Sequence, residues 1–315
     1  MRICRFRLNG NPSTGFYSEE AIIPLAVAVE AYRSASGERL ALEVSDNLLD
    51  YLPPDGRYFV AARELAEFVA AGELPADARL APSQVELLVP VPRPNKLFLL
   101  AGNYAKHIEE GGRRAEERRD TFPYVFMKPP QTTLTHPGDP VRIPAVSPGA
   151  IDWELELGVV IGRRCKGVSE ADALSYVAGY TVVNDISDRR FRPNPDRKKR
   201  EQDGFFDWLH GKWHDTFCPM GPCVVSADDV PDPQTLPMRL TVNGEVKQQA
   251  STADMIFPVA AVIEFISSFV TLEPGDVIST GTPSGVGATS GTFLKAGDRL
   301  AASIEGIGVL SNPVV

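Results

Sequence analysis

Hydrophobic and polar residues alternate along several short stretches of the chain, with the period of two that is typical of a half-buried β-strand. This pattern predicts strands at 3–8 and 151–162, and two mostly apolar stretches predict strands at 21–25 and 178–185. The stretch 96–101 is almost continuously apolar and predicts a strand that is buried on both faces. The chain should therefore contain an extensive sheet.

Apolar residues at helical spacing, together with end signals, predict three helices between the strands. The first covers 61–71 and stops before a glycine, which can adopt the left-handed conformation of a helix cap. The second covers 170–178 and follows Ser169, the first residue of a capping box. The third, at 258–269, starts with a proline and carries an apolar face.

A Gly-Asp turn recurs at 137–139, 274–276 and 296–298, each time preceded by Pro or Ala and followed by apolar residues. Glycine at the third position suits a type II turn that leads into a strand. Many turns and strands with few helices predict a mainly β (α+β) fold with a rolled or barrel-like β core.

The proline-rich stretch 89–94 predicts an extended linker, because alternating prolines block both helices and sheet ladders. We therefore expect a small N-terminal domain at 1–90, with strands and a helix but no polar cluster that suggests chemistry. The remaining residues, 91–315, should form a second, larger, turn-rich β domain.

Composition narrows the classes of protein that the chain can represent. The 315 residues are 43 % hydrophobic, which suits a folded globule, and 26 Gly and 27 Pro agree with many turns. A net charge of −9 argues against binding to nucleic acid. No apolar run is long enough for a membrane span, and no signal peptide is evident. The four scattered cysteines indicate reduced thiols, so we expect a cytoplasmic protein.

Carboxylates gather on two of the predicted strands. Asp152, Glu154 and Glu156 would point to one face of the strand at 151–162, and Asp185 ends the strand at 178–185. Stacked buried carboxylates are costly without a cation. An oxygen-only set of Glu154, Glu156 and Asp185 favours Mg²⁺, with Mn²⁺ or Ca²⁺ as substitutes. The alternative is an acidic strand face exposed to solvent.

A short helix predicted after Asn103, its candidate N-cap, would place His107 and Glu110 three residues apart on one face. A carboxylate beside an imidazole orients the ring and raises its basicity, as activation of a water molecule requires. The alternative is an incidental surface pair.

Two further segments contain candidate chemistry. Lys212 lies between two tryptophans and could stabilise an enolate oxygen or a substrate carboxylate, or it could simply pack its stem on an aromatic surface. His210 and His214 have the spacing of a zinc pair, which we keep as a minor alternative. In the glycine-rich loop 281–287, the Thr282 hydroxyl could bind a carboxylate.

Taken together and in order, these segments resemble the fumarylacetoacetate hydrolase superfamily over roughly 95–315. The motifs that carry the resemblance are Gly102-Asn-Tyr-Ala-Lys-His107, Phe126-Met-Lys-Pro-Pro130, the 137–139 turn, Asp152 to Gly162, Gly179 to Asp185, Gly211-Lys212 and Gly281 to Gly287. The resemblance implies a mixed β-sandwich roll with a small N-terminal α/β module, and it implies a homodimer.

The resemblance also implies roles for the candidate residues. Glu154, Glu156 and Asp185 correspond to the family's Mg²⁺ ligands, His107 and Glu110 to its water-activating pair, Lys212 to its catalytic lysine and Thr282 to a substrate-contacting threonine. Arg189 matches a family arginine, whereas Arg192 replaces a glutamine. We therefore expect Arg189 and Arg192 to bind an anionic substrate, such as a dicarboxylate.

The predicted activity is hydrolysis of a C–C bond in a 2,4-dioxo acid, an acylpyruvate or fumarylpyruvate-like compound, with Mg²⁺ as cofactor. Family members with these motifs also isomerise or decarboxylate unsaturated 2-oxo diacids, so these reactions remain open. A catalytically silent metabolite-binding protein is a further alternative. The expected partner is thus a small anionic oxo acid, with no nucleic acid and no membrane.

Overall fold

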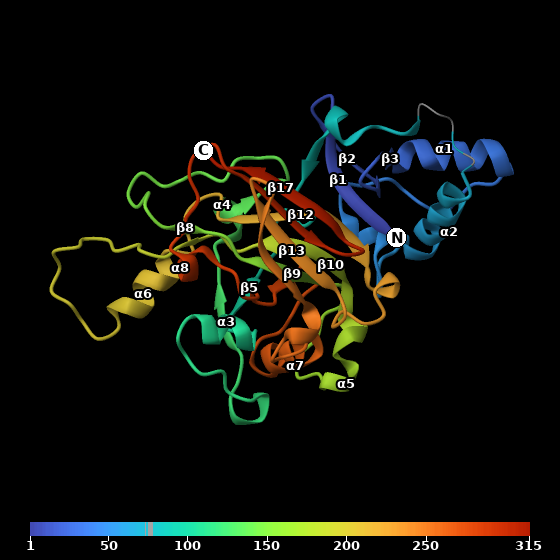
Figure 1. Cartoon of the computed structure of the whole chain (residues 1–315). Helices are drawn as coiled ribbons and strands as arrows, with labels where there is room; N and C mark the ends of the chain where they lie inside the picture. The colour runs from blue at the N-terminus through green and yellow to red at the C-terminus, as the bar shows by residue number, and fades with distance from the viewer. Residues whose placement is uncertain (73, 75–77) are drawn as a thin grey trace.

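The structure is a computed structural model that describes residues 1–72, 74 and 78–315. Within these residues the fold is a mixed α+β arrangement built on an eleven-stranded sheet, with a four-stranded sheet and a two-stranded ladder beside it (Figure 1). No helix among the described residues is long and apolar enough to cross a membrane.

The strands of the large sheet are β1 (Arg2–Leu8), β2 (Asn11–Tyr17), β3 (Ile22–Pro24), β4 (Glu86–Leu88), β5 (Leu97–Ala101), β6 (Tyr124–Met127), β7 (Leu134–Thr135), β9 (Leu155–Ile161), β10 (Val177–Asn184), β12 (Cys218–Ser226) and β15 (Val277–Ser279). The four-stranded sheet contains β13 (Pro237–Val242), β14 (Glu245–Ser251), β16 (Arg299–Ile304) and β17 (Gly308–Pro313), and the ladder pairs β8 (Ile151–Asp152) with β11 (Ser187–Asp188). The helices are α1 (Leu25–Ser36), α2 (Phe59–Ala70), α3 (Ala105–Glu110), α4 (Pro130–Thr133), α5 (Glu170–Ala173), α6 (Asp203–His210), α7 (Val259–Phe269) and α8 (Gly287–Ser290).

Strand β9 lies in the middle of the large sheet, hydrogen-bonded to β10 on one side and β15 on the other. Its alternation divides its side chains between two cores. Leu155 and Leu157 pack into the main core, which also contains apolar residues of the four-stranded sheet and of α7. Val160 packs into a second core shared with the N-terminal segment. The alternation predicted for this strand is confirmed.

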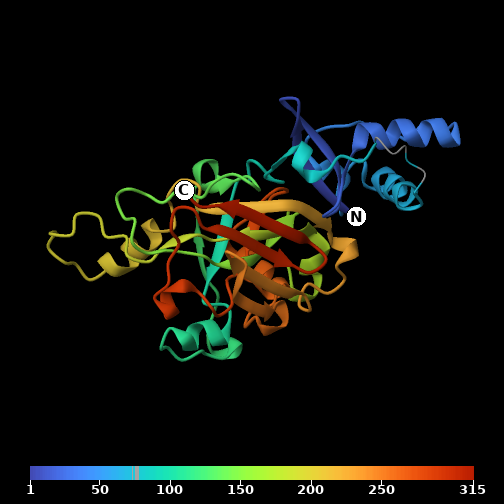
Figure 2. The ribbon, with the colours of Figure 1, turned by 45° about the horizontal axis from the view of Figure 1, so that its top comes forward.

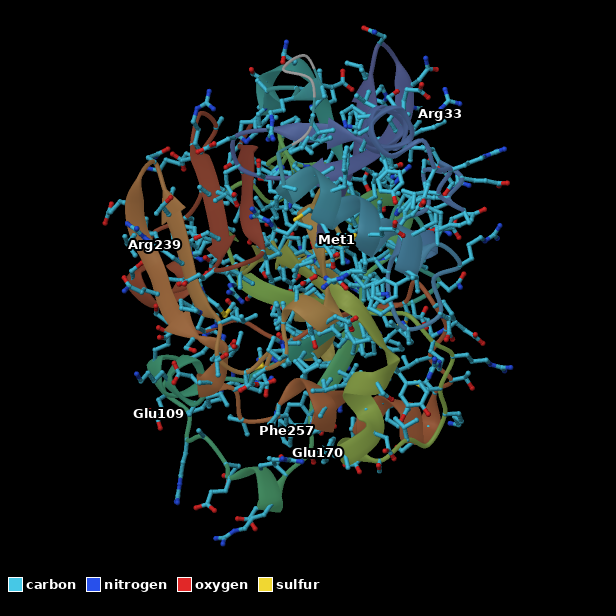
Figure 3. The ribbon with its side chains drawn as sticks, turned by 90° about the vertical axis from the view of Figure 1, so that its right-hand side faces the viewer. Met1, Arg33, Glu109, Glu170, Arg239 and Phe257 are labelled. Atoms are coloured by element: carbon cyan, nitrogen blue, oxygen red, sulfur yellow. The ribbon has the colours of Figure 1, made fainter. Side chains whose placement is uncertain are left out.

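The N-terminal segment extends the large sheet, because β1 pairs antiparallel with β12. Helices α1 and α2 lie on the outside of this extension, away from the four-stranded sheet (Figures 2 and 3). The stretch 89–94 connects β4 to β5, and Val89 and Val91 within it are buried.

The Gly-Asp turns have the predicted backbone, since Gly138, Gly275 and Gly297 adopt φ values of +86°, +87° and +95°. The second and third turns lead directly into β15 and β16. After the first turn there is only an isolated bridge between Val141 and Val314.

Two predicted elements differ from the structure. The helix expected at 170–178 ends at Ala173, and after one 3₁₀ turn the chain enters β10 at Val177, where pairing with β9 takes over. The strand expected at 151–162 breaks at Trp153, because β8 pairs with β11 while β9 pairs with β10. Helix α1 was not predicted.

Candidate active site

Three carboxylates meet at the end of the β9–β10 pair. Glu156 lies on β9 opposite Val183 of β10, Glu154 immediately precedes β9, and Asp185 follows β10. One ligand atom from each lies within 4.8 Å of the others, and all three side chains are buried. The Asp185 amide donates to the Glu154 carbonyl at 2.8 Å, which ties the two strand ends together. The three carboxylates predicted as metal ligands are therefore close together.

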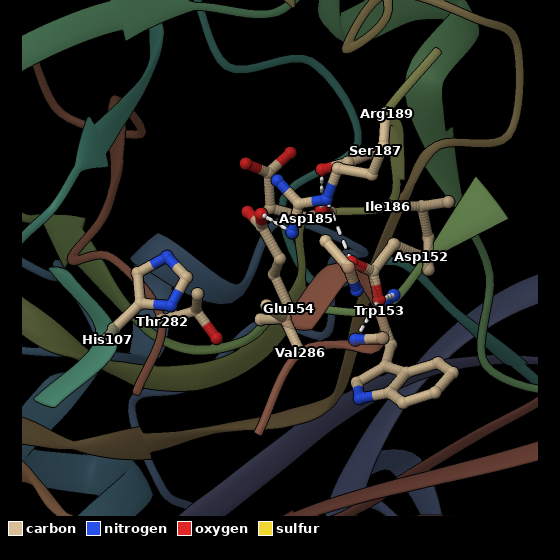
Figure 4. Close-up of polar contacts among 12 residues, drawn as sticks. His107, Asp152, Trp153, Glu154, Asp185, Ile186, Ser187, Arg189, Thr282 and Val286 are labelled. Carbon is tan, nitrogen blue, oxygen red and sulfur yellow. Dashed lines mark hydrogen bonds and ion pairs between the residues drawn. The ribbon is translucent and has the colours of Figure 1, made fainter. Parts of the chain in front are cut away.

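Three buried or half-buried cations surround the carboxylates. Lys212 Nζ donates to Glu154 Oε2 and Asp185 Oδ2, both at 2.5 Å. Arg189 pairs with Glu154 at 2.5 Å and with Asp152 at 2.8 Å, as the close-up in Figure 4 shows. Lys128 is fully buried and pairs with Asp185, while it also donates to the Ile186 carbonyl.

Lys128 belongs to the site although the sequence analysis gave it no role. The only signal was its presence in the Phe126–Pro130 motif, where a lysine follows an apolar strand. Trp208 and Phe126 flank Lys212, with ring centroids 5.9 and 5.4 Å from Nζ. The aromatic surroundings expected for Lys212 are present, but the partners are one tryptophan and a phenylalanine.

Burial and charge push the pKa values of the three carboxyls apart. Burial raises the pKa of Glu156 well above its ordinary value, and the negative charges of Asp185 and Glu154 add to this effect. Burial also raises the pKa of Asp185, although Lys128 and Lys212 oppose it. For Glu154, burial disfavours the charged form, but Arg189 and Lys212 outweigh burial and lower its pKa.

The donor set fits a divalent cation. Glu156 Oε2 accepts hydrogen bonds from Ser279 Oγ at 2.6 Å and the Gly281 amide at 2.9 Å. Its other oxygen, Oε1, is buried and has no hydrogen-bond partner among the described residues, which is costly unless another ligand takes it up. An oxygen-only set at this spacing matches the preferences of Mg²⁺ and Mn²⁺.

A histidine–carboxylate pair lies on α3. His107 Nδ1 and Glu110 Oε1 are 2.9 Å apart, and Glu110 Oε2 accepts from the Gly285 amide at 2.9 Å. The carboxylate therefore holds the ring through Nδ1, while Nε2 has no hydrogen-bond partner in the described part of the chain. Figure 4 shows His107 beside Thr282, on the side of Glu154 away from Asp152.

Asn103 does not cap this helix, because the N-cap position is Tyr104 and has no side-chain cap. The buried Asn103 side chain instead donates to the Phe257 and Thr280 carbonyls, at 3.1 and 2.8 Å, and accepts from the Phe257 amide. These bonds anchor the start of α3 to Phe257, which precedes α7, and to Thr280, which follows β15.

Thr282 is held by a residue that the sequence analysis missed. Gln248, buried on β14, accepts from the Leu155 amide at 2.9 Å and donates to Thr282 Oγ1 at 2.8 Å and to the Pro283 carbonyl at 2.9 Å. Because Oγ1 accepts from Gln248, the threonine hydroxyl hydrogen is free to donate elsewhere. No local pattern marks Gln248 for this role.

These groups border a cavity of about 700 Å³. Its lining includes His107, Glu154, Arg189, Lys212 and Thr282, and much of the remaining wall is aromatic. Five of the predicted site residues therefore share one cavity, with Glu110 behind His107.

Arg192 lies apart from this cavity: its side chain is exposed and is not part of the lining. His210 and His214 belong to no cluster of three potential metal ligands among the described residues. His214 Nε2 lies 3.4 Å from Asp188 Oδ2, and the two form only a pair. The zinc alternative therefore lacks further ligands in the described part of the chain.

The sequence family described as fumarylacetoacetate (FAA) hydrolase C-terminal matches residues 96–315. The chain is 38 % identical over 288 residues to a mitochondrial oxaloacetate tautomerase of Xenopus laevis, covering 88 % of this chain and 86 % of that protein. It is 39 % identical over 267 residues to a human mitochondrial oxaloacetate tautomerase, covering 84 % and 81 %.

Solved structures agree with these sequence relatives. A maleylpyruvate hydrolase from Sphingobium sp. SYK-6, in complex with manganese(II) and pyruvate, has a TM-score of 0.71 and 31 % identity, covering 100 % of this chain and 99 % of that one. A 5-carboxymethyl-2-hydroxymuconate delta-isomerase from Mycobacterium smegmatis has a TM-score of 0.69 and 29 % identity, covering 100 % and 98 %. Tautomerase, isomerase and hydrolase are thus all represented among proteins similar to this one, and the chain belongs to the fumarylacetoacetate hydrolase family.

Proposed function

We propose that this protein is a Mg²⁺-dependent hydrolase that cleaves a C–C bond in a 2,4-dioxo acid. The observation that carries the proposal is one cavity lined by His107 of the His–Glu pair, by Lys212 and by Glu154, which belongs to a buried oxygen-only carboxylate triad. The triad supplies ligands for a hard divalent cation, and the pair supplies a base. A protein that only bound a metabolite would have no need of that base.

Each residue then has a defined task. Glu154, Glu156 and Asp185 would hold the cation, which when bound supplies Lewis-acid polarisation of the substrate's 2-oxo group. His107, oriented through Nδ1 by Glu110, removes a proton from water. The resulting hydroxide adds to the distal carbonyl carbon, and the bond between that carbon and the neighbouring methylene carbon breaks.

The electron pair of the broken bond passes into the pyruvate half as an enolate. The positive charge of Lys212 lies beside the triad and favours that developing negative charge. The Thr282 hydroxyl, with its oxygen already accepting from Gln248, donates to the substrate carboxylate. Reprotonation of the enolate completes the reaction and yields a carboxylic acid and pyruvate.

A second candidate is keto–enol tautomerisation of oxaloacetate or isomerisation of an unsaturated 2-oxo diacid. The relatives named above favour it, and the same His107 could move a proton at carbon instead of water. The cavity volume of about 700 Å³ exceeds what four-carbon oxaloacetate requires, so it favours a longer substrate for cleavage or for isomerisation. Decarboxylation of an oxo acid would use the same enolate.

The test is to strip the protein with EDTA, restore Mg²⁺ or Mn²⁺, and follow loss of enol absorbance with acylpyruvates, oxaloacetate and unsaturated 2-oxo diacids. Product analysis separates cleavage from tautomerisation. His107→Asn should lower kcat by about 10²–10⁴-fold while leaving oxalate binding intact. Metal-dependent turnover of oxaloacetate alone would favour the second candidate, and no turnover at all would refute both.

A further inference from the structure

Aromatic side chains make up much of the cavity lining, and the proposed reaction gives them no task. We call them the aromatic wall, which consists of Phe122, Tyr124, Phe126, Phe205, Trp208, Phe265 and Phe269. Four of these side chains are 53–63 % exposed, those of Phe122, Tyr124, Phe205 and Phe269. Because large apolar groups are normally removed from water, a contiguous exposed set of this kind indicates a surface that a ligand covers.

The wall begins beside the charged part of the site. The Trp208 ring lies 5.0 Å from the Phe126 ring and 5.8 Å from the Phe205 ring, centroid to centroid. The ring centroids of Phe126 and Trp208 also lie 5.4 and 5.9 Å from Lys212 Nζ. The aromatic side chains therefore adjoin the lysine that is proposed to stabilise the enolate.

The wall continues along the edge strand β6. Tyr124 and Phe126 lie two residues apart on this strand, so their side chains share one of its faces. Beyond Tyr124, the Phe122 ring lies 5.4 Å from Tyr124 and 5.9 Å from Phe265, and Phe265 lies 5.2 Å from Phe269. The wall thus runs from α6 across β6 to α7 without interruption.

The chemistry of the wall suits a flat apolar group. Among its side chains, only Tyr124 and Trp208 carry a polar atom, so a hydroxylated chain would find few hydrogen-bond partners on it. An aromatic ring packs favourably against such faces in offset or edge-to-face geometry. The cavity volume of about 700 Å³ leaves room for a six-membered ring beyond the dioxo acid.

We infer that the cavity accepts an acylpyruvate whose acyl group is aromatic, with the ring packed on the aromatic wall. This inference rests on the proposed function for the reacting end of the substrate. Water adds to the carbonyl carbon that bears the ring, and the bond from that carbon to the methylene carbon breaks. The electron pair passes into the pyruvate enolate, whose reprotonation yields an aromatic carboxylic acid and pyruvate. The ring takes the place of the second carboxylate that was expected opposite Arg192, a residue outside the lining.

The experiment compares benzoylpyruvate with acetylpyruvate, which differ only in a phenyl or a methyl group on the reacting carbonyl. With the Mg²⁺-loaded protein, kcat/KM should be at least about tenfold higher for benzoylpyruvate. Phe205→Ala should lower that value about tenfold for benzoylpyruvate and at most about twofold for acetylpyruvate. Phe206→Ala is the matched control, because Phe206 is the next residue of α6, is also exposed and lies outside the lining; it should change neither value.

Binding of both compounds is measured by calorimetry in the His107→Asn background, where turnover is suppressed, so the wall is tested whether or not hydrolysis occurs. Tighter binding of benzoylpyruvate to a protein whose wild type cleaves neither compound would refute the hydrolase and support the aromatic subsite. The inference is overturned if benzoylpyruvate binds no more tightly than acetylpyruvate, or if Phe205→Ala weakens both equally. It is also overturned if Phe205→Ala dissociates an oligomer and leaves both affinities unchanged, since the wall would then be a subunit interface.

Discussion

Glu156→Gln should stabilise the metal-free protein while it removes the response to Mg²⁺. In the wild type, the charge of Glu156 is disfavoured by burial and by the charges of Asp185 and Glu154, and one of its oxygens has no partner in the described structure. Glutamine keeps a carbonyl oxygen for the Ser279 and Gly281 donors and places an uncharged amide beside the two remaining carboxylates.

The expected gain in stability of the Glu156→Gln variant can be estimated. Replacing a functional residue that destabilises the fold raises the free energy of unfolding by about 0.5–2 kcal/mol. For a chain of 315 residues this corresponds to a rise in Tm of about 1–3 °C without metal. Mg²⁺ at one hundred times its Kd should stabilise the wild type by about 2.7 kcal/mol, or about 4 °C, and leave the variant unchanged.

The pH dependence has a definite sign. A carboxyl group whose pKa is higher in the folded than in the unfolded protein binds more protons when folded, so its contribution to stability is lost as pH rises. For Glu156 this loss begins above the unfolded value of about 4.3 and continues through the raised folded pKa. The Tm of the metal-free wild type should therefore fall more steeply with pH than that of Glu156→Gln.

The assay is thermal unfolding from pH 5 to 9, with EDTA or with Mg²⁺. Glu20→Gln serves as the control, because Glu20 is an exposed carboxylate on the N-terminal segment. The reasoning is refuted if Glu156→Gln melts below the wild type in EDTA, or if it retains the shift caused by Mg²⁺.

Three further predictions concern other parts of the site. Lys128→Met should lower the free energy of unfolding by about 3–5 kcal/mol in urea titrations, because Asp185 loses a buried ion-pair partner; an unchanged midpoint would contradict this. Gln248→Leu should lower it by about 1–3 kcal/mol, since the buried Leu155 amide loses its acceptor, and a wild-type denaturation curve would argue against the network. Limited proteolysis should cut the segment 109–120, which follows most of α3, and Mg²⁺ with oxalate should slow that cutting; equal rates would exclude an ordering role for this segment.

Local sequence patterns were sufficient to predict the centre of the site. A period of two places Glu154 and Glu156 on one side of the chain, and the apolar run before Asp185 identifies it as the end of a buried strand. The i, i+3 spacing on a short helix likewise predicts the contact between His107 and Glu110. In each case the residues are close in the sequence, so the regular geometry of a strand or a helix is enough to place their side chains together.

The supporting residues could not be found in this way. Gln248 reaches Leu155 from another sheet, and Lys128 reaches Asp185 from beyond the edge strand β6. The basic run at 197–200 shows a related limit: Arg197 pairs with Asp203 and Asp207, so its charge is compensated within the same segment. Charge counted along a sequence does not reveal which cations are already paired.

Asp152 shows where an alternating pattern stops being informative. It shares the spacing of Glu154 and Glu156, but the strand breaks at Trp153, and Asp152 accepts from the Gly287 and Ala288 amides at 2.6 and 2.9 Å. It therefore holds the first turn of α8 and, through Arg189, one side of Glu154. Because Arg189 pairs with both carboxylates, Asp152 fixes the position of a ligand carboxylate without joining the ligand set. Asp152 on β8 and Glu156 on β9 follow the same alternation but have different roles. Only the change of pairing partner distinguishes them, because β8 pairs with β11 whereas β9 pairs with β10.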